Sequence, residues 1–214
     1  MTIDEAKKIN AENAAKTVIA GLKKRNMEGY YAADRGEALK IALSLIPEGS
    51  SIGWGGSVSV AEIGLQDAVK NGNYRVLDRA NAKDDEERRQ IYAQMGVCDF
   101  FLMSTNAITY GGELVNVDGT ANRVAFLCYG PSNVIVVAGV NKIVKDVNAG
   151  IDRARNVAAP ANAVRLGRAT PCTKTGKCED CQSPECICCQ TVITRRSSKA
   201  GRIKVILVGE DLGL

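Results

Sequence analysis

The sequence contains no histidine, and this absence limits the chemistry that the chain can perform. Histidine is the usual general base, proton shuttle and metal ligand near neutral pH. Without it, acid–base or nucleophilic chemistry must come from carboxylates, lysine, tyrosine, cysteine or a bound cofactor. The same absence removes histidine from any metal site.

Long apolar runs are also missing, and aromatic residues make up only 5% of the chain. No stretch of about 18 apolar residues is present, and no signal peptide opens the sequence. We therefore expect a soluble, cytoplasmic protein without membrane contact. Between residues 165 and 204, nine basic residues outnumber three acidic ones, but this stretch has no aromatic side chain to stack on a base. Nucleic acid is therefore not an expected partner.

A complete dinucleotide-binding fingerprint is absent as well. Gly53, Gly55 and Gly56 follow a short apolar run, but Val58 stands where the third glycine belongs, and no phosphate-loop lysine follows. The turn Gly55-Gly56-Ser57 nevertheless leads into a predicted helix, whose free N–H groups suit a phosphate or carboxylate. A tight strand–helix turn and an anion-binding loop are both open interpretations.

The chain does contain a repeated alternation of apolar strands and amphipathic helices. With 214 residues and 45% hydrophobic content, it can bury one full core. We predict a single α/β domain over 1–214, with a mainly parallel sheet and helices on both faces. The strands are expected at 51–54, 74–78, 99–103, 134–138, 191–194 and 202–208, and the helices at 2–25, 36–46, 57–70, 83–95 and 143–158.

Several predicted helices carry boundary signals. Thr2 and Glu5 form a capping box for the first helix, and Ser59 and Glu62 offer another after the glycine-rich turn. Pro160 is expected to close the last helix. The first helix has an alanine-rich face, which suits docking on its own domain or on a second subunit.

Polar residues cluster between 98 and 142, at the ends of two predicted buried strands. One strand is followed by Ser104-Thr105-Asn106 and the other by Asn141-Lys142, with a hairpin predicted over 106–117. In an open α/β sheet, ligands bind beyond the carboxyl ends of the strands. We therefore predict one anion-binding pocket, lined by Gly55, Gly56, Ser57, Asn106, Asn122, Arg123, Asn141 and Lys142. The alternative for Arg123 and Lys142 is a pair of sheet-end salt bridges.

Six of the eight cysteines lie between Cys172 and Cys189, with the spacing C-x5-C-x2-C-x4-C-x-C-C. In a cytoplasmic protein such a cluster more often binds a metal than forms disulfides. Cys178 and Cys181 are spaced to chelate one centre, and nearby basic residues would stabilise thiolates. Zinc and an iron–sulfur cluster both suit a metal-binding segment at 171–190. Free thiols in a surface loop are the alternative.

Several motifs occur together in a fixed order. The central stretch contains STNAIT, GGELVNVDGTANRVA, YGP and VIVVAGVNKIV; GWGGSVSVAEIG precedes it, and APANAVRLG, TPC, GKC, DC and SP follow. The chain thereby resembles the lactate-utilisation (LUD) domain family. The resemblance implies a fold like that of the sugar-phosphate isomerases and coenzyme A transferases. The same fold group suggests a homodimer.

The resemblance also implies a set of metal ligands, namely Cys172, Cys178, Cys181 and Cys188. This chain has two further cysteines in the segment, Cys186 and Cys189. Cys186 occupies a position where the family pattern has arginine. The fourth ligand therefore remains open.

Two functional hypotheses follow. Some members of the family take part in oxidising lactate to pyruvate alongside iron–sulfur partner proteins. The first hypothesis is accordingly a redox enzyme or subunit that binds a small 2-hydroxy acid through Asn122, Arg123 and Lys142 and passes electrons to the cysteine centre. The second is a transferase-like module that binds a phosphorylated or acyl-coenzyme ligand on the glycine-rich turn, with a structural metal. The acid–base or nucleophilic candidates are Glu62, Glu113 and Asp118.

Overall fold

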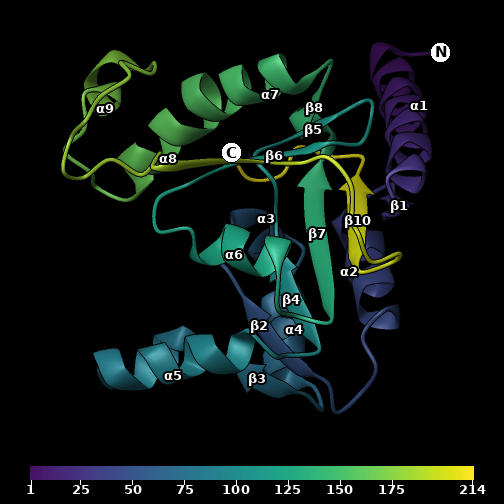
Figure 1. The fold of residues 1–214 in the computed structure, drawn as a ribbon. Coiled ribbons are helices and arrows are strands. Elements are labelled where there is room, and N and C mark those ends of the chain that lie inside the picture. Colours follow the sequence, from purple (N-terminus) through teal and green to yellow (C-terminus); the bar gives the residue numbers. More distant parts are fainter.

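The computed structural model describes residues 1–214, and a six-stranded sheet lies at its centre (Figure 1). The strand order is β1-β10-β7-β4-β2-β3, and every neighbouring pair is parallel. The strands are β1 (Glu28–Ala32), β2 (Ser51–Trp54), β3 (Arg75–Leu77), β4 (Phe100–Met103), β7 (Asn133–Gly139) and β10 (Ile203–Val208). The prediction of a mainly parallel sheet is confirmed.

Helices cover both faces of this sheet, as β7 illustrates. Val134 and Val136 face one core cluster, whereas Ile135 and Val137 face the other, because successive side chains of a strand alternate. The first cluster includes residues of α1 (Ile3–Lys24), α5 (Asp85–Met95) and α6 (Asn122–Cys128). The second includes residues of α2 (Arg35–Ser44), α3 (Val58–Glu62) and α4 (Leu65–Asn71). Helices on both faces are thus confirmed, and α6 is a helix that the polar sequence 118–123 did not predict.

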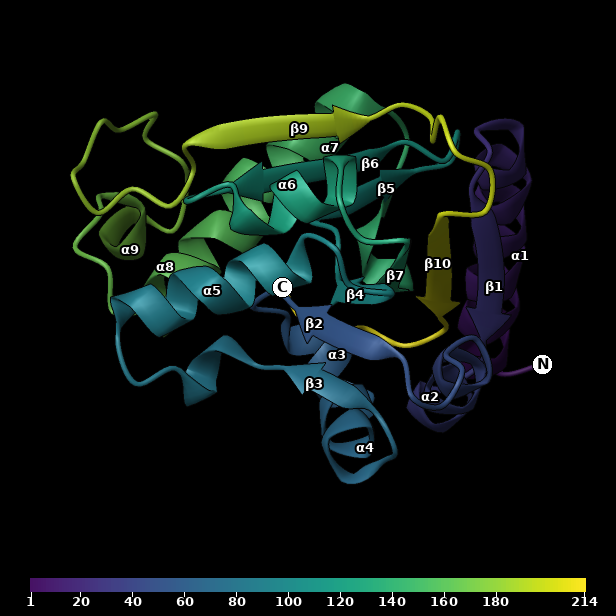
Figure 2. The ribbon, with the colours of Figure 1, turned by 60° about the horizontal axis from the view of Figure 1, so that its bottom comes forward.

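A second, smaller sheet stands beside the parallel one (Figure 2). Its order is β8-β5-β6-β9, with β8 (Ile143–Val144), β5 (Ala107–Thr109), β6 (Leu114–Asp118) and β9 (Gln190–Thr194). The predicted hairpin is confirmed, since β5 and β6 pair antiparallel. The strands predicted at 191–194 and 202–208 do not pair with each other, because β9 pairs with β6 and β10 with β7.

The glycine-rich turn leads into two short helices instead of the single helix predicted over 57–70. The chain breaks at Gly64, whose φ of +73° lies in the left-handed region. The N-cap of α3 is Ser57, whose hydroxyl accepts a hydrogen bond from Val60 N at 3.3 Å. The predicted capping box of Ser59 and Glu62 was therefore wrong. Ser59 lies in the first turn of α3 and is buried.

The last long helical segment continues past the proline that was expected to close it. It comprises α7 (Val147–Arg153), a π-helical turn (Ala154–Ala158) and α8 (Ala159–Arg165). Pro160 stands in the first turn of α8, where no intrahelical N–H is required and the ring fits. The element closes one side of the second sheet, where Gly150 lies against Val115.

Helix α1 docks on its own domain. The predicted capping box is present, because Thr2 and Glu5 exchange backbone–side-chain hydrogen bonds of 2.6 and 3.1 Å. Val18 and Leu22 are buried on the parallel sheet. The homodimer remains a prediction. None of the helices is both long and apolar enough to cross a membrane.

We expect Gly21→Ala to destabilise the protein, although alanine is the better helix former. A Cβ atom at Gly21 would lie 2.6 Å from the backbone of Gly111 in the β5–β6 turn, which cannot easily move. The expected loss is about 1–3 kcal/mol in urea unfolding. The control is Gly36→Ala in α2, where the new Cβ meets only the Asp34 side chain at 3.3 Å. Equal effects of the two substitutions would contradict the prediction.

Candidate functional site

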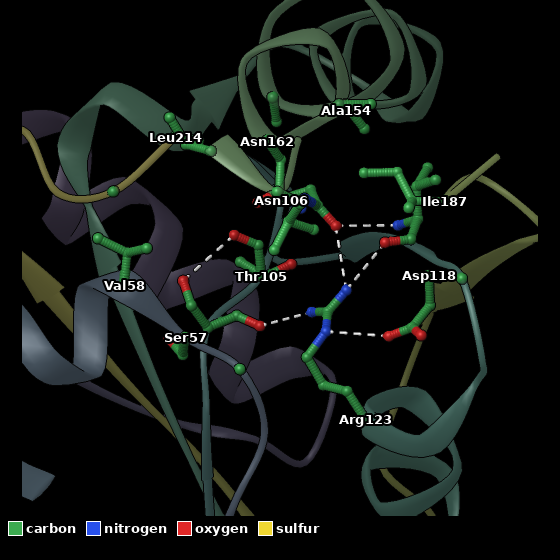
Figure 3. A pocket seen from close by; sticks show the side chains of 18 of the residues that line it. Ser57, Val58, Thr105, Asn106, Asp118, Arg123, Ala154, Asn162, Ile187 and Leu214 are labelled. Carbon is green, nitrogen blue, oxygen red and sulfur yellow. Dashed lines mark hydrogen bonds and ion pairs between the residues drawn. The ribbon is translucent and has the colours of Figure 1, made fainter. Parts of the chain in front are cut away.

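A polar pocket of about 440 Å³ lies beyond the carboxyl ends of β2, β4 and β7 (Figure 3). Its walls come from the turn after β2, the residues after β4, the β6–α6 turn, α8 and the cysteine-rich segment. Of the predicted site residues, it brings together Gly56, Ser57, Asn106, Asp118, Asn122, Arg123 and Lys142. The pocket therefore lies at the edge of the sheet that the sequence indicated.

Two predicted ligand residues lie behind the pocket lining. At Gly55, a Cβ atom would lie 3.2 Å from Cγ of Arg123, so this glycine makes room for the arginine stem. The amide of Asn141 pairs with the backbone of Leu212, accepting from its N–H at 3.2 Å and donating to its carbonyl at 3.4 Å. Asn141 thereby holds the segment after β10 against the end of β7.

The two predicted acid–base glutamates also lie outside the pocket lining. Glu113 forms an ion pair with Arg25 and accepts a hydrogen bond from Thr109 within the β5–β6 hairpin. Glu62 is exposed, and its carboxylate accepts a hydrogen bond from Gly213 N at 2.7 Å. Glu113 is therefore engaged within the hairpin, whereas Glu62 stands behind the lining residue Gly213 and is bound to its backbone.

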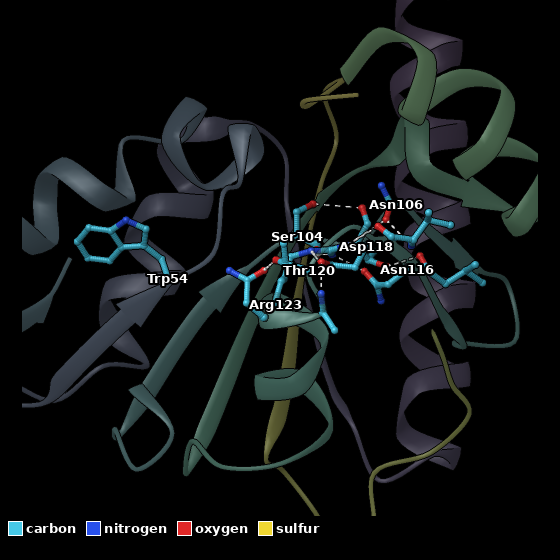
Figure 4. A network of polar contacts seen from close by, with 12 residues as sticks. Trp54, Ser104, Asn106, Asn116, Asp118, Thr120 and Arg123 are labelled. Carbon is cyan, nitrogen blue, oxygen red and sulfur yellow. Dashed lines mark hydrogen bonds and ion pairs between the residues drawn. The ribbon is translucent and has the colours of Figure 1, made fainter. Parts of the chain in front are cut away.

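Arg123 occupies the floor of the pocket, and all five of its N–H groups are engaged within the protein (Figure 4). The acceptors are Asp118 Oδ2 (3.1 Å), the Ser104 carbonyl (2.8 Å), Asn116 Oδ1 (2.5 Å), Asn106 Oδ1 (3.2 Å) and the Val117 carbonyl (3.0 Å). A guanidinium has five N–H donors, so none is left for a ligand. Arg123 therefore forms the sheet-end ion pair that was considered as the alternative.

Asp118 fixes the turn that carries this arginine. Its second oxygen accepts a hydrogen bond from Ala121 N at 3.0 Å, and Ala121 has a left-handed φ of +63°. The turn then leads directly into α6, where Asn122 donates to the Tyr92 hydroxyl at 2.9 Å. The polar sequence thus forms a rigid corner between the second sheet and α6.

Lys142 lies at the base of the pocket and is only 4% exposed. Its Nζ donates to Ser59 Oγ at 3.0 Å and to Ser104 Oγ at 3.1 Å, and it has no salt-bridge partner. Burial, and to a smaller extent the charges of Arg153 and Arg123, lower the pKa of Lys142 to about 7, whereas the charge of Glu62 opposes the shift.

The sequence did not indicate the two serines around Lys142. The sequence pattern predicts Ser59 as a helix cap and Ser104 only as a polar residue after a strand. The three residues come from separate segments that follow β2, β4 and β7, so no local spacing reveals that they meet. Only the parallel alignment of β2, β4 and β7 brings these segments together.

Comparison with known proteins identifies the family. The model of the LUD domain matches residues 15–208. The chain belongs to the LUD domain family. Membership suggests a function related to lactate utilisation. No curated protein matches this LUD domain. Among solved structures, it is similar to a DUF162 family protein from Deinococcus radiodurans, with 14% identity, a TM-score of 0.49, and 94% of this chain and 98% of that chain covered.

The cysteine-rich segment of the LUD domain begins with the short helix α9 (Cys172–Thr175). All of its cysteines are free thiols, and no group of three or more Cys, Asp or Glu side chains is arranged to hold a metal ion. Burial, together with the neighbouring thiols of Cys186, Cys178 and Cys172, raises the pKa of Cys188 to about 12. The thiols are thus near enough to affect one another without converging on one centre. As a donor set, they fit a soft metal.

This segment also forms one wall of the pocket. Ile187, between Cys186 and Cys188, is a lining residue. A Cβ atom at Gly119, in the β6–α6 turn, would lie 3.4 Å from Cα of Ile187. The cysteine-rich segment and the pocket are therefore directly adjacent in the LUD domain.

We expect Arg123→Met to destabilise the LUD domain by about 3–5 kcal/mol, because it leaves the buried Asp118 carboxylate without its partner. Urea unfolding followed by circular dichroism measures the loss. The control is Arg88→Met on α5, which removes one exposed ion pair with Asp85 and should cost less than about 1 kcal/mol. A loss no larger than that of the control would contradict the conclusion that the ion pair and hydrogen bonds of Arg123 stabilise this corner of the domain.

Proposed function

We propose that the LUD domain binds a small organic anion in this pocket, with the Lys142 ammonium as the positive charge at its base. The observation that carries the proposal is a buried lysine without a carboxylate partner, facing a polar cavity. An unpaired buried charge is costly, so a ligand that supplies the counter-charge would bind favourably.

The charges around the pocket support an anionic ligand. The charged lining residues are Arg79, Arg123, Lys142, Arg165, Arg168 and Asp118. Asp118 is paired with Arg123, so the lining is left with an excess of positive charge. Basic residues at the mouth would also attract an anion from solution. The volume of about 440 Å³ suits a small metabolite.

A 2-hydroxy acid related to lactate is the ligand class that family membership favours. Its carboxylate would pair with Lys142, and its hydroxyl would find donors and acceptors in the amides of Asn122 and Asn162, which line the same pocket. The adjacent cysteine-rich segment supports a redox role for the complex. If Cys172, Cys178, Cys181 and Cys188 hold an iron–sulfur cluster, it would supply electron transfer beside the ligand; zinc there would only stabilise the wall.

A second candidate, a phosphorylated or acyl-coenzyme ligand, is favoured by the glycine-rich turn. Gly56 and Ser57 line the pocket, and Arg79 lies beside Gly56, where a Cβ atom would come within 3.4 Å of its Nη2. A phosphate at the mouth would therefore meet a guanidinium and a hydroxyl.

We expect lactate, pyruvate or inorganic phosphate to raise the melting temperature of the wild type but not of Lys142→Met. Above pH 7, affinity should fall by up to about tenfold per pH unit, because Lys142 then loses its proton while the ligand stays anionic. Isothermal calorimetry between pH 6 and 9 measures the dependence.

The matched control for this prediction is Lys145→Met. Lys145 lies three residues further along, is exposed, and is outside the pocket lining. It should keep the wild-type melting shift. Equal binding by wild type and Lys142→Met, or none by either, would contradict the proposed function.

We expect the protein purified under anaerobic conditions to contain zinc or iron, and the double substitution C178S/C181S to remove it. These two cysteines provide the chelating pair of the proposed centre. Elemental analysis and the visible spectrum distinguish zinc from an iron–sulfur cluster. Cys128→Ser, which changes an exposed cysteine outside the segment, is the control. Stoichiometric metal in the double variant would contradict the assignment.

A further inference from the structure

Two serine hydroxyls and one lysine amine meet at the base of the pocket. Besides the two bonds from Lys142, the hydroxyl of Ser104 lies 3.4 Å from that of Ser59. The three side chains come from different segments: Ser59 from α3, Ser104 from the residue directly after β4, and Lys142 from the 3₁₀ turn Val140–Lys142 after β7. The third N–H of Lys142 has no partner within the protein.

The burial of Lys142 between Ser59 and Ser104 is not explained by a contribution to the stability of the fold. Ser59 is 1% exposed and Ser104 is 8% exposed, so the amine is buried among neutral hydroxyls and not beside a carboxylate. Two hydroxyls are weak compensation for a buried ammonium, whereas the neutral amine fits the same place at little cost. A neutral amine in hydrogen-bonding contact with a hydroxyl can act as a base for a nucleophile.

We propose that Ser104 and Lys142 are a nucleophile–base pair for acyl transfer from small esters or thioesters, with Ser59 as a second hydroxyl that relays the proton. The proposal rests on the pocket being the ligand site argued above, and it assigns that site a reaction. Ser104 is the nucleophile because it is the more exposed serine and directly follows β4, at the edge of the sheet where ligands bind.

The surrounding structure fixes the position of Ser104. Arg123 Nη1 donates to its carbonyl at 2.8 Å, and its hydroxyl lies 3.3 Å from the carbonyl of Thr105. Arg123, which is paired with Asp118, therefore also fixes the backbone of Ser104. Such pre-organisation is what a nucleophile requires for an oriented attack.

The reaction proceeds through a covalent acyl-serine. Ser104 Oγ forms a bond to the acyl carbon, and its proton passes to Nζ of Lys142, directly or through Ser59. The bond from the acyl carbon to the leaving alcohol or thiol breaks, and the leaving group takes this proton from Lys142. Water then attacks the acyl carbon, gives one proton to Lys142, and releases a carboxylic acid while Ser104 recovers its proton.

The ionisation of Lys142 is consistent with this role. With its pKa lowered to about 7, Lys142 has a substantial population of the neutral amine near neutral pH. The charged groups that act on it are Arg153 of α7 and Arg123 of α6, which favour the amine, and Glu62 of α3, which opposes them. The acylation rate should therefore rise with pH and level off above about 8.

The backbone at Gly213 lies directly against the pair. A Cβ atom there would be 2.7 Å from Ser59 Oγ and 3.3 Å from Lys142 Nζ, and the φ of +59° favours glycine. Substrate therefore approaches from the Ser104 side of the pocket. A side chain at position 213 would press on Ser59 and Lys142.

The test uses p-nitrophenyl acetate as an acyl donor, with stopped-flow detection of p-nitrophenolate and mass mapping of the acetylated residue. We expect a burst of product and one acetyl group on Ser104. The burst rate should fall at least about 100-fold in Ser104→Ala and in Lys142→Met. Lys145→Met and Ser198→Ala, which change exposed residues outside the pocket, should keep the wild-type rate.

The outcomes separate this inference from the proposed function. Anion-induced melting shifts in both wild type and Ser104→Ala, without any acetylation of Ser104, would overturn acyl transfer and leave anion binding intact. Acetylation of Lys142 or Ser59 instead of Ser104 would also overturn the assignment. Circular dichroism shows whether each variant is folded. Ser104→Cys, which retains a nucleophile at the same position, should still be acetylated there.

Discussion

The buried ion pair between Arg123 and Asp118 joins the two sheets of this LUD domain, and the pocket depends on it. Arg123 stands on α6, yet its N–H groups bind the carbonyl at the end of β4 and four acceptors of the β5–β6 hairpin and its ends. Breaking such a pair leaves a buried charge, so the arrangement is rigid. The pocket therefore has a fixed floor against which other groups are positioned.

Arg123 is buried together with a carboxylate partner, whereas Lys142 is buried without one and has a lowered pKa instead. Its pKa of about 7 lies far below that of a lysine in water, so at neutral pH the folded state bears much of the cost of burying an ammonium. That cost disappears as pH rises from 7 toward 10, because the folded state releases its proton while the unfolded state keeps it. Strongly shifted pKa values cluster at functional sites. Anion binding and acyl transfer both use this property, one through the ammonium and the other through the amine.

The sequence predicted the parallel sheet, the hairpin and the location of the pocket, because apolar runs and turn residues report local structure directly. It did not predict the partners of polar side chains. Arg123 is adjacent to Asn122 in the sequence, but only the fold shows that its five donors are engaged. Ser59 matched a capping pattern, yet the helix begins two residues earlier and turns this serine toward Lys142. The sequence predicted that Pro160 ends a helix. In the structure Pro160 lies in the first turn of α8, directly after a π-helical turn.

The pairing of β1 places a demand on biosynthesis. This strand, residues 28–32, has β10 as its only neighbour in the sheet, and β10 spans residues 203–208. As the chain leaves the ribosome, β1 must wait without a partner until nearly all other elements have been made. Such distant pairing slows folding and leaves an unpaired strand edge exposed to association with other chains. The amphipathic helix α1, which precedes β1 and packs beside it, can cover this strand during the delay.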